Sequence, residues 1–320
     1  MIPPRALLTV LTVIAAASVM LAVSIGSVSL NWPALWTGGG SIVDRTILFD
    51  LRLPRAAAGF AVGGLLALAG ALMQVLLRNP LADPYVLGIS GGAASAALLA
   101  ILAGVSGFGL TAAAFAGALV SMALVFGLAR GRGSWNPVRL LLTGVVVAAG
   151  WAALIGFILT ISPTSGLKNM LFWLMGDLDF AGDPLPALTA LLAGLALSFA
   201  LARDLNVLAR GELQSRALGV DAARLSLAIY VIASLLTAAA VTLAGSVGFV
   251  GLIVPHTLRL LGVTDHRLLL PGSVLLGGAL VTCADAATRT ALAPQQLPVG
   301  ILTAFLGIPV FLYLLNRGRG

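Results

Sequence analysis

The sequence predicts an all-α membrane protein with ten transmembrane helices. Its 320 residues are 60% hydrophobic and only 9% charged, and the mean hydropathy is +1.09. A soluble globule covers itself with polar groups, and this composition supplies too few. Lipid offers the backbone no hydrogen-bond partners, so a spanning segment must be a helix or part of a closed barrel. Barrel strands alternate polar and apolar residues, whereas runs such as 110–128 do not.

About 20 apolar residues cross the hydrocarbon core as a helix. The first apolar stretch is longer than a signal-peptide core and is expected to stay in the protein as a helix. The eighth is short and interrupted by Pro255. The predicted spans are 6–27, 54–77, 84–104, 109–130, 138–161, 185–202, 225–247, 250–262, 268–290 and 297–316.

The positive charges support ten spans and a cytoplasmic N-terminus. Of the 18 lysines and arginines, five then lie outside and the rest inside, as the positive-inside rule requires. The outer five are Arg45, Arg52, Arg55, Lys168 and Arg289. With nine spans, Arg259, Arg267, Arg317 and Arg319 would move outside. The net charge of +7 therefore reflects membrane orientation, and nucleic-acid binding is not expected.

The sequence lacks the residues that several classes of protein function require. A phosphate-binding P-loop needs a lysine after its glycines, and the one lysine, Lys168, follows a single glycine in an outer gap. His256 and His266 lack the spacing of a zinc hydrolase. Asp285 is the one acidic residue deep in a span, and Arg289 can pair with it on one helix face, which gives a proton-coupled carrier little support.

Two smaller features concern packing and redox state. Glycine pairs such as Gly63-Gly64 and Gly91-Gly92 fit close helix packing in lipid. The single Cys283 forms no internal disulfide and leaves the redox compartment open.

Three gaps between the predicted spans carry more distinctive sequence than a simple connection requires. RNPLADP at 78–84 joins spans two and three on the inner side, where the residue before each proline is kept out of helix; a simple tight turn explains it equally well. GELQSRALG at 211–219 predicts a short amphipathic helix with Leu213, Ala217 and Leu218 on one face and Gly219 as a left-handed terminator. Its apolar face favours a partner protein, the alternative being a solvated loop helix.

The third gap is the outer LRLPR at 51–55. Pro54 fits the first turn of the second span. Arg52 and Arg55 would then lie near a helix N-terminus, which favours anions. They are expected to meet an acidic surface from outside, with Arg289 as a third contact. The alternative is local neutralisation by Asp44 and Asp50.

These segments make the chain similar to the FecCD family of ABC-transporter permeases, which import iron chelates, haem and vitamin B12. The resemblance covers about 51–316 in ordered blocks. They are RLPR at 52–55, MQ at 73–74, RNPLADP at 78–84, LG at 87–88, GE…ALG at 211–219, GFVGLIVPH at 248–256, DHRLLLPG at 265–272, AD…R at 284–289 and LPVGILTAFLGIPVF at 297–311.

The resemblance implies a type II ABC importer permease: one polytopic domain over 1–320, with ten spans like those of the vitamin B12 permeases and a cytoplasmic coupling segment at 203–225. Such a protein is not an enzyme and needs no cofactor of its own, because ATP-Mg is bound by partner subunits. The expected partners are a second permease, identical or paired, two cytoplasmic ATPase subunits, an extracytoplasmic binding protein and membrane lipid. The expected location is the cytoplasmic (inner) membrane, with both termini cytoplasmic.

The resemblance also assigns residues. Arg52, Arg55 and Arg289 resemble the arginines that dock the binding protein, and Asn79 and Leu81 match an inner constriction. ATPase coupling falls to the segment with Gly211, Glu212, Ser215, Ala217, Leu218 and Gly219. The chain departs from the family at Ser134-Trp135-Asn136-Pro137, where a second constriction is expected.

The cargo stays open between a siderophore, haem and cobalamin. TDHRLLLPG at 264–272 and MLFWLMGD at 170–177 are most similar to vitamin B12 permeases, yet haem and siderophore permeases carry similar strings. The path should be wide and mostly uncharged. An ion-gradient-driven secondary transporter is the alternative class.

Overall fold

The computed structural model describes residues 3–26, 28–36, 41–130, 136–292 and 295–317. Within these ranges the chain folds into helices, with no strand. The longer helices are α1 (Pro4–Ser24), α4 (Leu53–Leu76), α5 (Ile89–Leu102), α6 (Phe108–Arg130), α7 (Pro137–Ile161), α9 (Leu185–Ala200), α12 (Ala222–Ala244), α13 (Val250–Leu260), α14 (His266–Ala291) and α15 (Val299–Arg317).

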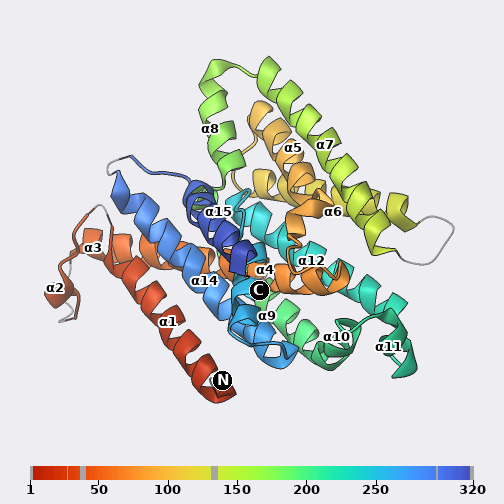
Figure 1. Cartoon of the computed structure of the whole chain (residues 1–320). Coiled ribbons are helices and arrows are strands. Elements are labelled where there is room, and N and C mark those ends of the chain that lie inside the picture. The colour runs from red at the N-terminus through yellow and green to blue at the C-terminus, as the bar shows by residue number, and fades with distance from the viewer. Residues whose placement is uncertain (1–2, 27, 37–40, 131–135, 293–294, 318–320) are drawn as a thin grey trace.

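Shorter helices lie in the connections. They are α2 (Trp32–Trp36), α3 (Ile42–Thr46), a π-helical stretch (Ile47–Arg52), α8 (Thr164–Met175), α10 (Ala202–Leu208), α11 (Glu212–Ala217) and 3₁₀ turns at Pro84–Leu87 and Leu178–Phe180. Helix α8 was not predicted, because a 12-residue helix is too short to span and carries Lys168. It packs beside α5, along the lobe formed by α5, α6 and α7 (Figure 1).

The predicted spans each coincide with an observed helix. In the described part of the chain, six helical segments are long and apolar enough to cross a membrane: α1, Ile42–Leu76, α6, α7, α12 and α14. The pair α9 and α10 is bent by 61°, and α5, α13 and part of α15 are shorter apolar helices. The all-helical fold is confirmed, and the number of ten spans stays a prediction.

Helix α4 forms the centre of the bundle and is buried on nearly every face. It packs against α9, α12, α13 and α14. Glycines allow the closest of these contacts: the Cα of Gly63 faces the carbonyl of Gly277, and the Cα of Gly70 faces that of Gly251, so closely that a Cβ at Gly70 would lie 1.8 Å from the carbonyl oxygen. Small residues give the van der Waals contact that holds helices together in lipid.

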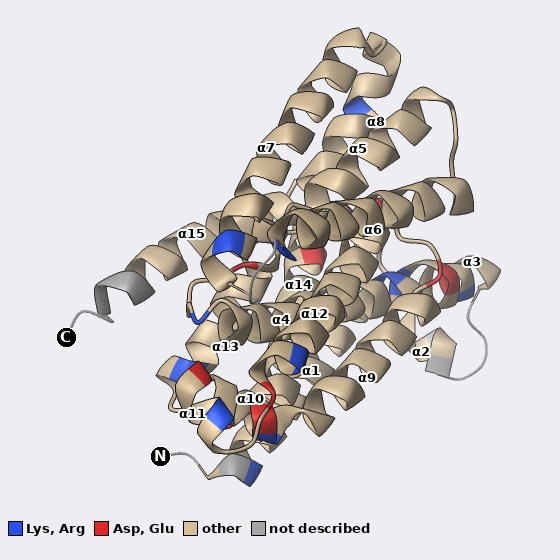
Figure 2. Ribbon diagram, turned by 90° about the vertical axis from the view of Figure 1, so that its right-hand side faces the viewer, with Lys and Arg blue, Asp and Glu red and all other residues tan. Residues whose placement is uncertain are grey.

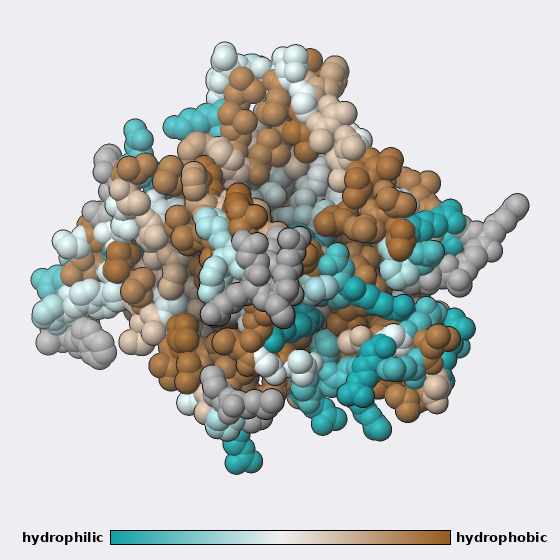
Figure 3. All heavy atoms as spheres, viewed as in Figure 1, coloured by the Kyte–Doolittle hydropathy of each residue, from teal (hydrophilic) through white to brown (hydrophobic). Residues whose placement is uncertain are grey.

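The outer surface of the bundle is apolar, as a lipid-facing surface requires. Helices α6 and α7 bury little of their apolar length within the chain, 22% and 11% respectively. Figure 3 shows hydrophobic side chains spread over this face. Charged residues gather instead around α10 and α11 and around α3 (Figure 2). This separation agrees with a membrane between two polar ends.

One predicted boundary is wrong. Pro54 does occupy the first turn of α4, but helical backbone already begins at Ile42 and continues without a break to Leu76. Ser41 caps the true N-terminus, where its hydroxyl accepts the N–H of Asp44. Arg52 and Arg55 therefore lie well inside a helical segment, and no helix N-terminus supports anion binding beside them.

Candidate functional site

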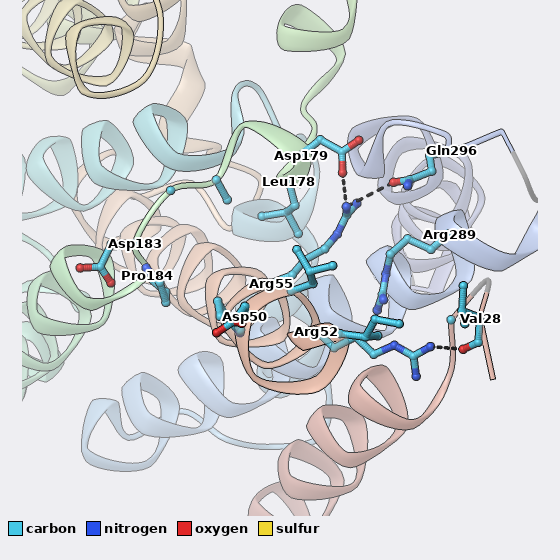
Figure 4. Close-up of a pocket in the computed structure, with 16 residues that line it drawn as sticks. Val28, Asp50, Arg52, Arg55, Leu178, Asp179, Asp183, Pro184, Arg289 and Gln296 are labelled. Atoms are coloured by element: carbon cyan, nitrogen blue, oxygen red, sulfur yellow. Dashed lines mark hydrogen bonds and ion pairs between the residues drawn. The ribbon is translucent and has the colours of Figure 1, made fainter. Parts of the chain in front are cut away.

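The three outer arginines of the sequence analysis come together. Arg52, Arg55 and Arg289 line a cavity of about 670 Å³ between the π-helical stretch, α4, α14 and the turn after α8. Figure 4 shows their side chains extending along this cavity. Asp50, Asp179 and Asp183 also line it, so the cavity carries acidic as well as basic groups. We call it the outer mouth.

Asp285 joins two of these arginines. Its carboxylate accepts the Nε of Arg55 at 3.0 and 3.1 Å and the Nη2 of Arg55 at 2.9 Å. It also pairs with the Nε of Arg289 at 3.0 Å, four residues along α14. Asp285 and Arg289 are both buried. The predicted Asp285–Arg289 pair is confirmed, and Arg55 is a further partner that lies 230 residues away in the chain.

Arg55 carries the most accessible of the three guanidinium groups. Its Nη1 forms an ion pair with Asp179 and donates to the Oε1 of Gln296 at 3.2 Å (Figure 4). The side chain of Arg55 is 15% exposed and that of Asp179 is 47% exposed. Asp177 lies 3.9 Å from Arg55 and is buried, and this burial raises the pKa of its carboxyl to about 6.

Arg52 and Arg289 face the last turn of α1. Arg52 donates to the carbonyls of Val23 at 3.0 Å and Ser24 at 3.1 Å, and also to that of Val28. Arg289 donates to the carbonyl of Ala22 at 3.0 Å. Helix C-termini leave carbonyls without partners inside the helix, and basic side chains can satisfy them. These two arginines therefore connect the end of α1 to the π-helical stretch and to α14.

At the opposite end, the residues predicted for the inner constriction form a tight turn. The Oδ1 of Asn79 accepts the N–H of Leu81 at 2.9 Å. The carboxylate of Asp83 accepts the N–H of Tyr85 at 2.8 Å, and burial raises the pKa of Asp83 to about 6. Asn79 is exposed. Ser134 and Trp135, where the sequence departs from the family's second constriction, lie outside the described residues. Asn136 caps α7 by accepting from Val138 and Arg139.

The predicted coupling helix is present as α11. Leu213 is 86% exposed and Leu218 is 66% exposed, and Ala217 beside them is exposed too. Gly211 and Gly219 bracket the helix with φ angles of +118° and +78°, a backbone that favours glycine. The apolar face and the left-handed terminator are confirmed.

Helix α11 is stabilised by contacts within itself and by one ion pair to another segment. Ser215 is buried and donates to the carbonyl of Gly211 at 2.9 Å. The carboxylate of Glu212 pairs with Arg216 at 2.8 Å and with Arg78 of the RNPLADP turn at 3.3 Å. The structure thus links two segments that the sequence analysis treated separately.

Sequence reasoning missed several polar contacts. Gln74 on α4 accepts from Arg259 on α13 and donates to the carbonyl of Leu252 at 3.2 Å. The MQ block at 73–74 singled out Gln74, but the sequence did not reveal that Arg259 is its partner. Asp177 and Asp179 fall in an outer gap opposite the arginines, and that charge pattern was the one signal that could have found them. Over the ranges that the structure describes, no group of three His, Cys, Asp or Glu residues could hold a metal ion.

Comparison with known proteins places this arrangement in a family. Residues 12–317 match the model of the FecCD transport family. The chain belongs to that family. The prediction of a FecCD transport permease, a membrane subunit rather than an enzyme, is therefore confirmed.

Individual FecCD relatives match along nearly the whole chain. The chain is 43% identical to the cobalamin import system permease protein BtuC of Halobacterium salinarum, over 97% of this chain and 87% of that protein. It is 37% identical to the hemin transport system permease protein HmuU of Yersinia pestis, over 99% and 97%. A solved structure assigned to the metal-chelate type of ABC transporter, in an inward-facing conformation, matches with a TM-score of 0.87 at 32% identity, over 97% and 98%.

Proposed function

We propose that the chain is the permease subunit of an ABC importer that carries a metal chelate across the cytoplasmic membrane. The match of residues 12–317 to the FecCD transport family carries this conclusion, and the likeness to cobalamin and hemin permeases supports a cargo of that size and chemistry. Two copies, or two related permeases, enclose the path, and both termini lie in the cytoplasm. Cobalamin is the first cargo to test, since that relative shares the higher identity of the two.

The coupling segment at 203–225 contacts the partner ATPase subunits, which bind ATP-Mg. It transmits their conformational change to the permease. The exposed Leu213 and Leu218 support this role, because an apolar face on a polar surface needs a cover. The Glu212–Arg78 ion pair supplies a direct contact from α11 to the turn that holds Asn79 and Leu81. A movement of α11 is then transmitted to the inner constriction through this single ion pair.

The outer mouth docks the extracytoplasmic binding protein. Arg55 is the arginine that meets an incoming carboxylate, because its Nη1 faces the half-exposed Asp179, which a carboxylate of the partner can replace. Arg52 and Arg289 contribute mainly by positive potential and by holding α1 beside the mouth. When a carboxylate of the partner replaces that of Asp179, the guanidinium of Arg55 stays paired throughout. This avoids the cost of an uncompensated charge.

Docking by exchange is tested by two substitutions of opposite effect. Asp179→Asn removes the competing carboxylate and should strengthen association with the binding protein several-fold, whereas Arg55→Gln should weaken it and flatten its salt dependence. Lys168→Gln removes an outer charge on α8, away from the mouth, and is the matched control. If Asp179→Asn weakens association, Asp179 itself contacts the partner and the exchange is wrong.

The import function is tested in proteoliposomes that hold the permease with its ATPase and binding protein. We expect cobalamin uptake that requires ATP, and loss of uptake with Leu218→Asp, which charges the covered face. Haem and a hydroxamate siderophore serve as alternative cargoes. Uptake by the permease alone, driven by an ion gradient without ATP, would instead establish a secondary transporter.

A further inference from the structure

A second cavity lies on the side of the molecule that carries α10 and α11. It has a volume of about 280 Å³ and is lined by Arg203, Asn206, Val207, Arg210, Leu218, Asp265 and Arg267. We call it the α10 pocket. Its three arginines are exposed, and within the described ranges none of them forms an ion pair with an acidic side chain.

The one acidic group of the pocket is already engaged. The Oδ1 of Asp265 accepts the N–H of Arg267 at 2.9 Å, which caps α14, and the Nδ2 of Asn206 at 2.7 Å. These two hydrogen bonds lower the pKa of Asp265 and keep its carboxylate ionised. Three guanidinium groups against one carboxylate leave the pocket positively charged.

Polar contacts make this pocket a defined structure. The Oδ1 of Asn206 accepts the backbone N–H of His266 at 2.9 Å and lies 2.6 Å from the Nδ1 of the His266 ring. His266 is buried. Asn206 thus joins α10 to the first turn of α14 through both its amide oxygen and its amide nitrogen. The wall that carries Arg203 and Arg210 is held against the wall that carries Arg267.

We propose that the α10 pocket receives a carboxylate side chain of the partner ATPase. This inference rests on the proposed function and names the chemistry by which that partner is recognised. Guanidinium groups bind carboxylates through paired, planar hydrogen bonds. The pocket offers three of them against the single carboxylate of Asp265, which already accepts hydrogen bonds from Asn206 and from the backbone of Arg267. Leu218 belongs both to the pocket wall and to the exposed face of α11, so a protein that covers that face also closes the pocket.

The packing of α10 favours a protein over a lipid headgroup. Ala202, Leu205 and Leu208 are all buried against the bundle, while Arg203 and Arg210 point outward. A helix that lies in a membrane surface does the opposite and buries its apolar face in the acyl chains. Helix α10 therefore has no apolar face left for lipid, although an acidic headgroup would satisfy the same charges.

The test measures binding of the cognate ATPase subunit to the permease in nanodiscs at several salt concentrations. Replacing Arg203, Arg210 and Arg267 together by alanine should weaken binding about tenfold or more and reduce its salt dependence. Replacing all three by lysine should give an intermediate loss, since the charge stays and the planar geometry goes. Arg5→Ala is the matched control, because Arg5 is exposed on α1, outside both the pocket and the coupling segment.

Thermal unfolding of the alanine variant confirms that it is folded, which is expected for three exposed side chains. Unchanged ATPase affinity and an unchanged salt slope overturn the proposal while ATP-dependent uptake by the wild type still upholds the import function. Unchanged ATPase affinity with loss of bound phosphatidylglycerol, compared in phosphatidylcholine discs with and without that lipid, also overturns it and assigns the pocket to a headgroup. A wild-type permease that binds no ATPase overturns both.

Discussion

Asp285→Asn removes the carboxylate that joins the outer arginines and keeps the shape of the side chain. The wild-type carboxylate is 2% exposed and pairs with Arg55, which is 15% exposed, and Arg289, which is 9% exposed. The neutral amide leaves both guanidinium groups with less compensating charge in a site from which water is largely excluded. Its NH₂ group also donates where the carboxylate accepted.

Removing one partner of a buried ion pair costs about 3–5 kcal/mol. Two contacts survive here: Arg289 keeps the carbonyl of Ala22, and Arg55 keeps Asp179. We therefore expect a loss near the lower bound, about 3 kcal/mol, which corresponds to a fall of about 5 °C in Tm for a chain of this length. A reversible denaturant titration in mixed micelles measures the free energy directly.

The double variant Asp285→Asn with Arg289→Gln separates the charge effect from general disruption. Its loss should be smaller than the sum of the two single losses, since residues in one ion-pair network couple by about 0.5–3 kcal/mol. Asp50→Asn is the control, because Asp50 lines the same mouth and is exposed. A loss below about 1 kcal/mol for Asp285→Asn would refute the assignment of Asp285 as the central carboxylate of this buried network.

Two further predictions concern packing and pH. Gly70→Ala places a Cβ 1.8 Å from the carbonyl oxygen of Gly251 and should destabilise the protein by about 1–3 kcal/mol, measured as a lower Tm; Gly150→Ala on α7 has open space and should not lower it. The Asp177 carboxyl has its pKa raised to about 6 by burial, so its contribution to stability is present at low pH and is lost as pH rises through about 6. From about pH 4 to pH 7 the wild type should lose up to about 3 kcal/mol relative to Asp177→Asn, and parallel stability profiles would contradict this.

The sequence predicted the helices well because lipid enforces long apolar runs. The helix after Gly211 and the left-handed Gly219 were also predictable, since both depend on local backbone preferences. Asp285–Arg289 followed from helical spacing alone. These features need no knowledge of which helices are neighbours.

The outer mouth was only partly predictable. A polar stretch before Pro54 suggested a loop, yet the backbone passes through a π-helical stretch and remains helical. Such stretches are rare and leave little trace in sequence. The pairing of Arg55 with Asp285, and of Arg52 with the end of α1, depends on tertiary packing. The arginines were correctly selected, but the sequence could not tell that each already has acceptors within the chain.

Helix α14 begins beside Asp265 and carries Asp285 near its other end. Twenty residues of helix separate these aspartates, a distance of about 30 Å, which is close to the thickness of the hydrocarbon core. A tilt of about 5° would shift one end relative to the other by about 2.6 Å over that length. A rigid tilt of α14 would therefore break or form hydrogen bonds at the far membrane surface, although the backbone of the helix itself would not change.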